Sequence, residues 1–467
     1  MVAIVWLRRS MREYDNTAIV RASKNHDKIV PFYVVDDEYF ASHDLGYPRV
    51  RFWRDSLADL KEKLQEKGKD LVIRKGKPLK ELKKVVDEVD ADEVYHNRDY
   101  EPYARERDEK VSQELDISVK TFKDVVLHEK REILTNKGEP YKVYSYYRDK
   151  WFKKEKRKPQ EPENYEVPKL ESDNVPSLEE LGFKWEGDWP WRGGRKSGKK
   201  KLEKFVENQI FNYEDKRDFP AESSTSKLSP HLKFGTISIR EAYWAAEEAR
   251  KKTGDESGID TWEEELAWRD FYFQVLWNWP EEAEKAFLEK YRGIDWHWDD
   301  KHKELWKKFK KGRTGFPFVD AAIRQMNETG WMHNRPRMVV ASFAAKDLHV
   351  DWRKLHKVMS ERLVDAEIAS MLGGIQWAYS VGTDAQPYFR VFNPWTQGEK
   401  HDPDGKYIRE WIPELDKVPE QYIHRPYKMP EDVQEESGCR IGEDYPEPVV
   451  AHKEEKEKAV ELFEKAS

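Results

Sequence analysis

Apolar residues in the first 125 positions follow two alternating patterns. Near-continuous apolar runs predict strands that are covered on both faces. They lie at residues 2–7, 28–35, 70–74, 92–97 and 117–122. Between these runs, apolar residues recur every three or four positions, which predicts helices, most clearly at 50–67, 79–89 and 102–115. Strands that alternate with helices predict a doubly wound parallel α/β sheet.

Residues 126–200 break this alternation. Prolines recur there among lysines and glutamates, which is typical of a long connector, and one short helix is expected near 144–154. From residue 201 onward the pattern is helical. The clearest expected helices are 201–213, 239–253, 261–278, 318–329, 336–348 and 364–371. The predicted architecture is an α/β domain at 1–125, an interdomain linker at 126–200 and an all-α domain at 201–467.

The composition narrows the class of protein. The 467 residues carry 84 Lys and Arg against 91 Asp and Glu, and the formal net charge of -7 disfavours a uniformly basic nucleic-acid coat. Basic runs at 192–204 and 301–313 fit either solvated helix faces or a positive groove. The single cysteine, Cys439, excludes an internal disulfide and a cysteine-based metal site, and no metal is expected. We expect a soluble, cytoplasmic protein, because the sequence has no 18-residue apolar run and no signal peptide.

Tryptophan is concentrated in one part of the chain. Of the 19 tryptophans, 12 fall between Trp262 and Trp411. Aromatic rings beside arginines suit stacking on bases, holding a heteroaromatic cofactor, or passing electrons. In the expected helix at 261–278, Glu265, Trp268 and Arg269 share one face. That face suits a planar base with polar edges, and equally a core tryptophan beside a surface ion pair.

The loop TSKLSP at 225–230 places three hydroxyls and a lysine before a helix. Such groups hold phosphate oxygens at helix starts, although an ordinary cap and turn use the same residue types. Neither a GxGxxG nor a Walker-type loop follows the first strand. The α/β domain is therefore not expected to hold the main cofactor in the Rossmann manner.

Three further segments carry a family resemblance. They are RDFPAE at 217–222, TGWMHNRPRM at 329–338 and VGTDAQPYFRVFNP at 381–394. With them the chain resembles the photolyase/cryptochrome superfamily, specifically the class I cyclobutane pyrimidine dimer DNA photolyases, nearly end to end from residues 6–16 to 445–454. The resemblance implies an α/β antenna domain, a long linker and a helical FAD-binding domain, which agrees with the predicted architecture.

The resemblance implies a reduced FAD bound in a U shape by the helical domain. The positions that match contacts on its phosphate side are Tyr213, Thr225, Ser226, Lys227, Leu228 and Ser229. Those that match the surroundings of the flavin, ribose and adenine are Trp262, Glu265, Arg269, Asn334, Arg337, Asp365, Glu367 and Met371. Arg337 and Asp365 would stabilise an anionic reduced flavin, or form a structural ion pair that a non-repairing relative also has.

The resemblance implies a deoxyribodipyrimidine photo-lyase, a monomer that acts on UV-damaged DNA containing pyrimidine dimers. The matched catalytic positions are Glu265 and Asn334 at the pyrimidine edges, Met338 against the dimer, and Trp268 and Trp377 on either side of the flipped-out dimer. Asn334, where relatives that repair (6-4) photoproducts use histidine, favours cyclobutane dimers. The matched DNA-binding positions are Arg217, Trp268, Arg269, Arg335, Trp377 and Arg390.

The implied mechanism is light-driven electron transfer from excited reduced FAD to the dimer, followed by ring opening and return of the electron. One alternative is a cryptochrome-like blue-light photoreceptor that binds FAD without repair. Another is an FAD-bearing nucleic-acid binder without photochemistry. Retention of Glu265, Trp268 and Trp377 favours repair, because a pure sensor has no need of a site for the dimer.

The chain departs from the family at several positions beside the flavin. Met371 replaces the asparagine that usually faces flavin N5, and a thioether cannot hydrogen-bond N5 as an amide does. The usual Asp-Gly-Asp reads Asp365-Ala366-Glu367. Of the three positions of the family's tryptophan relay, Ile375 and Phe309 have lost the indole and Trp352 keeps it. These changes favour slow or rerouted photoreduction.

An antenna chromophore is expected at the α/β domain. The turn NRDYEPYARERD at 97–108 resembles that of deazaflavin-binding relatives, with Asp99 and Glu101 at matching positions. Folate-binding relatives usually carry glutamate where Ala104 stands. An 8-hydroxy-deazaflavin is the first expectation and FMN or FAD the next, against a sheet-edge loop that binds no chromophore.

Overall fold

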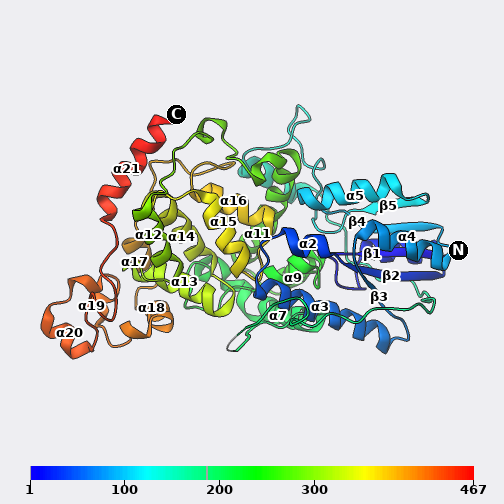
Figure 1. Ribbon diagram of the computed structural model, residues 1–467, viewed down its shortest axis with the longest axis horizontal. Coiled ribbons are helices and arrows are strands. Elements are labelled where there is room, and N and C mark those ends of the chain that lie inside the picture. Colours follow the sequence, from blue (N-terminus) through cyan, green and yellow to red (C-terminus); the bar gives the residue numbers. More distant parts are fainter. Residues whose placement is uncertain (1, 186–187, 467) are drawn as a thin grey trace. The chain divides into compact units, whose positions relative to one another are not determined.

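Five parallel strands form one sheet in the computed structural model, which describes residues 2–185 and 188–466. Their order across the sheet is β3-β2-β1-β4-β5, and Trp6 of β1 pairs in register with Phe32 of β2 (Figure 1). The strands are β1 (Val2–Leu7), β2 (Lys28–Val35), β3 (Val72–Lys75), β4 (Glu93–Asn97) and β5 (Ser118–Phe122). The predicted α/β sheet is confirmed, with strand ends shifted by one or two residues at most.

Helices cover both faces of the sheet because its strands are apolar on both. Alternate strand residues such as Ile4 and Phe32 pack with Leu82 and Val111 on one face. The helix after β1 is buried along most of its length against the strands. The covering helices are α1 (Thr17–Ser23), α3 (Tyr47–Glu66), α4 (Pro78–Val89) and α5 (Pro102–Glu114), and the short α2 (Asp37–Ser42) follows the end of β2.

The chain divides into two compact units that do not follow chain order. The first combines Met1–Glu214, Ser226–Pro280 and Val364–Ala369. The second combines Asp215–Thr225, Glu281–Leu363 and Ser370–Ser467. This division rests on spatial contacts, so the domain limits at residues 125 and 200 stay a prediction.

The first unit contains a buried network of two aspartates and two arginines. Asp124 accepts hydrogen bonds from Arg12 (2.7 Å) and Arg240 (2.6 Å), and Arg240 also bonds Asp15 at 2.7 Å. All four residues are at most 2% exposed. The network therefore ties the turn after β1 to helix α10 (Ile239–Arg250), far away in the sequence.

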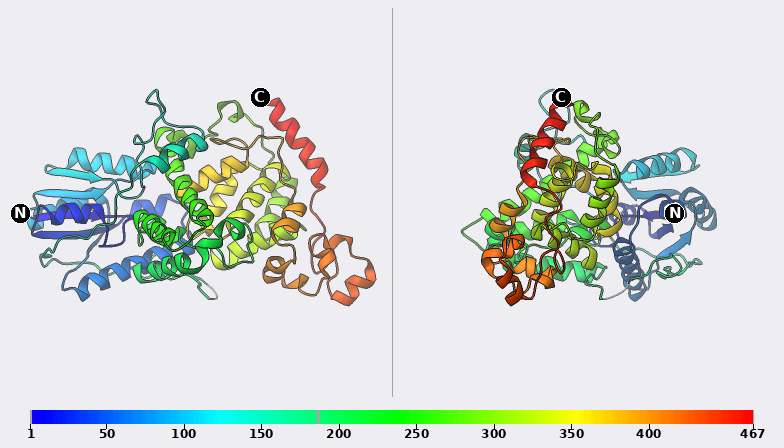
Figure 2. Two further views of the ribbon diagram at one scale, coloured as in Figure 1. Left: turned by 180° about the vertical axis from the view of Figure 1, so that it is seen from behind. Right: turned by 60° about the vertical axis from the view of Figure 1, so that its left-hand side comes forward.

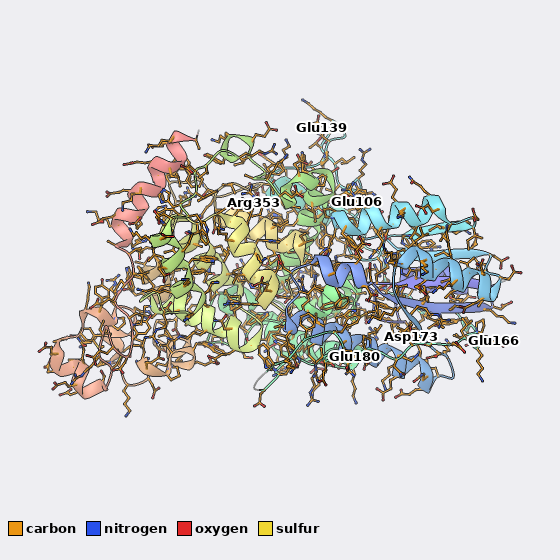
Figure 3. The ribbon with its side chains drawn as sticks, viewed as in Figure 1. Glu106, Glu139, Glu166, Asp173, Glu180 and Arg353 are labelled. Atoms are coloured by element: carbon orange, nitrogen blue, oxygen red, sulfur yellow. The ribbon has the colours of Figure 1, made fainter. Side chains whose placement is uncertain are left out.

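The predicted connector is attached to the sheet by its backbone. The Ile29 amide donates to the Glu166 carbonyl at 2.9 Å, and the Asp173 amide donates to the Ile73 carbonyl at 2.9 Å. Figure 3 labels Glu166 and Asp173 on this segment. Its one substantial helix before residue 190 is α6 (Tyr144–Lys153), as predicted.

Four further helices complete the first unit. The expected helix at 201–213 is helical throughout but changes type, because α7 ends at Lys204 and gives way to a π-helical turn at Phe205–Gln209 and a 3-10 turn at Ile210–Asn212. The helices are α7 (Arg195–Lys204), α9 (Ser229–Phe234), α10, and α11 (Ser257–Asn278), while the short α8 (Tyr213–Lys216) begins where the unit ends.

The second unit is helical. Helix α13, almost wholly buried, packs against α12, α14, α17 and α18, and α21 lies on the outside of the group (Figures 1 and 2). The expected helix at 364–371 was misplaced, because residues 364–367 are not helical and the helix begins at Ile368. The helices are α12 (Asp300–Lys310), α13 (Pro317–Thr329), α14 (Asn334–Lys346), α15 (Trp352–Arg362), α16 (Ile368–Ala378), α17 (Pro394–His401), α18 (Lys406–Trp411), α19 (Glu420–Ile423), α20 (Glu431–Ser437) and α21 (His452–Lys465).

No helix within residues 2–185 and 188–466 has the length and apolar character needed to cross a membrane. No group of three His, Cys, Asp or Glu side chains there could hold a metal ion.

Glu282 gives the second unit a specific pH dependence. It is 3% exposed, and burial, reinforced by Glu281, raises its pKa from 4.5 to about 8. The folded chain thus keeps a proton that the unfolded chain loses, so stability falls as pH rises from 4.5 to 8. Glutamine does not titrate, so the free energy of unfolding of Glu282→Gln is expected to increase by about 1 kcal/mol relative to that of the parent as pH rises from 6 to 7. Urea unfolding at the two pH values measures this difference. The exposed Glu284→Gln is the control, and an unchanged difference across this interval would contradict the raised pKa.

Candidate functional site

The predicted phosphate-binding loop is built around a left-handed residue. Lys227 has φ of 49°, which turns the chain immediately before α9. The Leu228 amide is 3.4 Å from the Ser226 hydroxyl, and Ser229 donates from its hydroxyl to Asp365 at 2.6 Å. Ser229 and Asp365, both predicted cofactor residues, are thus brought together within the first unit.

Glu367 lies in a buried cluster of charges in the same unit. Arg9 donates to Glu367, to Asp99 at 3.1 Å and to Glu101 at 3.2 Å. Arg269 is 3.7 Å from Glu367 and donates to the Val125 carbonyl at 2.6 Å. Burial disfavours the charge of Glu367, but Arg9, Lys233 and Arg269 together outweigh burial and hold the pKa of Glu367 below its usual value. One guanidinium therefore joins a predicted flavin-side acid to both predicted antenna acids.

Three predicted cofactor residues have a buried polar atom with no hydrogen-bond partner in residues 2–185 and 188–466. They are Arg269 Nη2 and Glu367 Oε1 in the first unit and, separately, Thr225 Oγ1 in the second unit. Buried polar groups in native proteins are normally satisfied, so unsatisfied atoms at predicted ligand contacts are those that a polar cofactor would complete. The residues present therefore fit FAD.

Trp262 and Tyr213 are core residues of the first unit. Trp262 is 3% exposed and its ring lies 5.2 Å from that of Phe205, which in turn lies 5.6 Å from Tyr213. Phe205 opens the π-helical turn that interrupts the predicted helix. The interruption thus places an aromatic ring between the two predicted cofactor residues.

Tyr144 contacts a predicted site residue, Trp268, and was not itself predicted from the sequence. Its ring stacks face to face on Trp268, with centroids 3.5 Å apart and planes at 10°, and its hydroxyl donates to the Glu264 carbonyl at 2.9 Å. Trp268 and Glu265 are half-buried on α11. The aromatic run YSYY in the connector was the available signal, and it lay in a segment interpreted as a linker.

Tyr144→Ala is expected to weaken binding of a dimer-containing oligonucleotide about 2- to 12-fold, because an aromatic pair contributes about 0.5–1.5 kcal/mol and holds Trp268 in orientation. Fluorescence anisotropy titration measures the change. Tyr144→Phe keeps the stacked ring and should bind nearly as the parent does. Tyr146→Ala, at a 64% exposed position of the same helix, is the control. If Tyr144→Ala and Tyr146→Ala bind the dimer-containing oligonucleotide equally well, Tyr144 does not contribute to dimer binding.

The second unit brings four predicted substrate-side residues to one depression. Arg335 and Met338 of α14, Trp377 of α16 and Arg390 all line it. Arg335 also donates to Asp218 at 2.6 Å, next to the predicted DNA contact Arg217. The depression combines an aromatic face, a thioether and guanidinium groups.

Asn334 and Arg337 begin helix α14. Asn334 is exposed, and its amide lies 3.9 Å from the Met338 sulfur. Arg337 donates to the Met332 carbonyl at 2.7 Å. Each of the two side chains thus has a contact within or just before the first turn of α14.

The relay positions are buried in the second unit. Trp352 is 1% and Ile375 4% exposed, and Met371, at the position expected to face flavin N5, is 9% exposed. Phe309 is fully buried and stacks on Trp306, with ring centroids 4.8 Å apart. A tryptophan therefore lies in contact with the position that lost one.

A cavity in the first unit lies where β1, β2 and β4 end. Strand order reverses between β1 and β4, and small molecules commonly bind at that point of a parallel sheet. Asp99 and Glu101 line the cavity, which holds about 870 Å³ of empty space including the part open to solvent. Other lining residues, which the sequence did not single out, include Arg8, Arg9, Asp36, Tyr39, Arg49, Trp53, Tyr103, Arg107 and Lys233.

Comparisons with known proteins agree with this arrangement. Family models described as "DNA photolyase" and "FAD binding domain of DNA photolyase" match residues 3–165 and 262–465. The deoxyribodipyrimidine photo-lyase of Halobacterium salinarum is 40% identical, with 99% of both chains covered. A class III photolyase from Agrobacterium tumefaciens superposes with a TM-score of 0.93 at 34% identity, over 99% of this chain and 97% of that one.

A third relative carries a second flavin. An archaeal photolyase from Sulfolobus tokodaii, described with two FAD molecules and a novel light-harvesting cofactor, superposes with a TM-score of 0.85 at 33% identity, with 100% of both chains covered. The near-complete coverage in all three comparisons, together with the parallel sheet and helical region, shows that the chain belongs to the photolyase/cryptochrome superfamily, among the deoxyribodipyrimidine photo-lyases.

Proposed function

We propose that this protein repairs cyclobutane pyrimidine dimers in DNA under light. The observation that carries the proposal is the depression in the second unit, where Trp377, Met338, Arg335 and Arg390 lie together. A half-buried indole beside arginines suits an unstacked pyrimidine pair on a phosphate backbone. The names of the relatives support the same substrate.

Different side chains would bind different parts of the damaged DNA. By the family resemblance, Trp268, which Tyr144 supports in the first unit, and Trp377 in the second would each offer a stacking surface to the extruded dimer. Extrusion costs a few kcal/mol, and stacking contributes about 1–3 kcal/mol per base, so two platforms offset it. Glu265 and Asn334 would hydrogen-bond the pyrimidine edges, and Met338 would pack on the dimer. Arg217, Arg335 and Arg390 would position the phosphates without reading sequence.

The cofactor is proposed to be FAD, held by the loop 225–229 and by Trp262, Arg269, Arg337, Asp365 and Glu367. In its reduced form FAD would supply, under blue or near-ultraviolet light, the electron that opens the cyclobutane ring. Arg9 keeps Glu367 ionised and fixed, so this carboxylate would present its unsatisfied oxygen to the ligand.

A light-dependence assay tests the repair function. The reduced holoprotein is incubated with an oligonucleotide that carries one thymine dimer, in light and in darkness. Loss of dimers only in light is expected, and no loss in either condition would overturn the proposal. A photoreceptor without repair activity, which Met371 and Ile375 favour, would show light-dependent spectral change with the dimers intact.

Photoreduction is expected to be slow, because Ile375 has no π system to carry an electron hole. The oxidised holoprotein, illuminated with a thiol reductant, is expected to reach the reduced state slowly, and Trp352→Phe is expected to leave that rate unchanged. Absorbance at the flavin bands follows the reaction. The parent and Trp352→Phe should repair dimers equally well when each has been chemically reduced beforehand. Rapid reduction that Trp352→Phe abolishes would show an intact relay.

The cavity at the sheet edge is proposed to bind an antenna chromophore. Its aromatic and charged lining fits a flavin-sized molecule, with 8-hydroxy-deazaflavin first and FMN or FAD next. The second FAD described for the Sulfolobus tokodaii protein supports a flavin. Extraction of chromophores from the purified protein, followed by mass spectrometry, tests this; one FAD and nothing else would overturn it.

A further inference from the structure

The depression with the predicted substrate residues has one wall from the C-terminal helix. Lys456 of α21 lines it together with Arg335, Trp377 and Arg390. Lys456 lies on the solvent-exposed side of α21 and is distant in sequence from the other lining residues. Neither the resemblance nor the relatives assign a role to this helix.

Helix α21 is anchored firmly enough to place that side chain. His452 bonds Asp347 at 2.6 Å, and Glu455 bonds His349 at 2.7 Å. Phe463, fully buried, lies 3.4 Å below the Lys346 ammonium. The first, second and last turns of the helix are thus each attached to the body of the unit.

The same helix supports the loop that carries Arg390. Tyr388 stacks on Phe463 with centroids 5.7 Å apart and planes at 3°. Phe389, the next residue, is 57% exposed and lines the depression. Helix α21 therefore holds one side of the depression in shape as well as adding a cation to it.

The charges at this place are available to an anion. Lys458 and Lys465 of α21 pair with Glu455 at 2.8 Å and Glu461 at 3.9 Å. Across residues 2–185 and 188–466, no ion pair joins a carboxylate to Lys456 or to Arg390. Two cations without carboxylate partners on one depression fit the phosphodiester backbone of a nucleic acid.

We propose that α21 forms part of the DNA-binding surface and that Lys456 contacts a backbone phosphate. This inference rests on the proposed function, because it assigns the strand held at the depression. It extends the phosphate contacts beyond the three predicted arginines to a helix that is acidic overall, with five glutamates against four lysines. The contact is therefore a property of one side chain and not of the helix as a whole.

Salt-dependent binding tests the contact. Full-length holoprotein is titrated with a duplex that carries one thymine dimer and with its undamaged counterpart, at several salt concentrations in darkness. Lys456→Ala is expected to make the slope of log K against log[salt] less steep by about 0.9. The ratio of the parent's affinity to that of the variant should therefore fall about 3.5-fold between 50 and 200 mM salt. Lys456→Arg should keep the parent slope.

Lys453→Ala is the matched control, because Lys453 is an exposed lysine one turn away on α21 that does not line the depression. Alanine is the best helix former, so both variants should fold, and equal thermal midpoints would verify it.

The outcomes separate this inference from the repair function. If Lys456→Ala and Lys453→Ala share the parent slope while the parent removes dimers in light, the contact is overturned and the function stands. If only Lys456→Ala loses slope and no dimers are removed in light, the contact stands and the repair function falls. A parent that binds neither duplex overturns both.

Discussion

Replacing Asp124 by alanine is expected to destabilise the first unit by about 3–5 kcal/mol, because it leaves the buried guanidinium of Arg12 without its carboxylate and leaves Arg240 with Asp15 alone. Asp124 is 2% exposed and accepts from Arg12 and Arg240 as well as from the Thr17 amide and hydroxyl. Burial alone would raise its pKa, but the two arginines outweigh burial and hold the pKa well below the usual value. Urea unfolding at neutral pH measures the loss.

The control for this substitution is Asp87→Ala on the exposed side of α4. The sign of the pH dependence offers a second check. Since the folded-state pKa of Asp124 is depressed, its contribution is present above the pKa of an unfolded aspartate and is lost as pH falls through the folded value. A parent and an Asp124→Ala variant of equal stability at neutral pH would show that the network contributes nothing.

Trp377→Ala is expected to weaken binding of dimer-containing DNA about 5- to 150-fold, the equivalent of about 1–3 kcal/mol of stacking on one base. Trp377 lies half-buried in the depression beside Met338. Undamaged duplex should bind as before, because its bases stay stacked and the arginines still contact its phosphates. Competition titration with the two duplexes measures the ratio.

Trp298→Ala serves as the matched control, since Trp298 is 37% exposed and does not line the depression. An equal loss of affinity for damaged and undamaged DNA in Trp377→Ala would point to a deformed surface instead of a lost stacking platform.

The sequence predicted those features that depend on local patterns. The runs at 2–7 and 28–35 became β1 and β2 without any shift, because strands covered on both faces are apolar throughout. The helix at 364–371 was misplaced because its acidic residues, Asp365 and Glu367, are used by Ser229 and Arg9. Their partners come from distant parts of the chain, which a local pattern cannot show.

The candidate site shows the same limit. The resemblance supplied Trp268 and Trp377, but Tyr144 and Lys456 contribute through placement. A tyrosine in a connector and a lysine in an acidic C-terminal helix give no signal until folding brings one to Trp268 and the other to Arg390. The wall of a surface depression is a property of neighbours in space.

The Arg240–Asp15 contact also has a consequence for the order of events during synthesis. The two residues are 225 positions apart, which a ribosome covers in about 11–45 s at ~5–20 residues per second. Until Arg240 emerges, Asp15 lacks a cation that the finished fold supplies, and Glu367 reaches Arg9 later still. A nascent or truncated chain that ends at residue 200 would therefore contain the whole sheet, but with Asp15 paired to Arg157 alone and Asp124 paired to Arg12 alone.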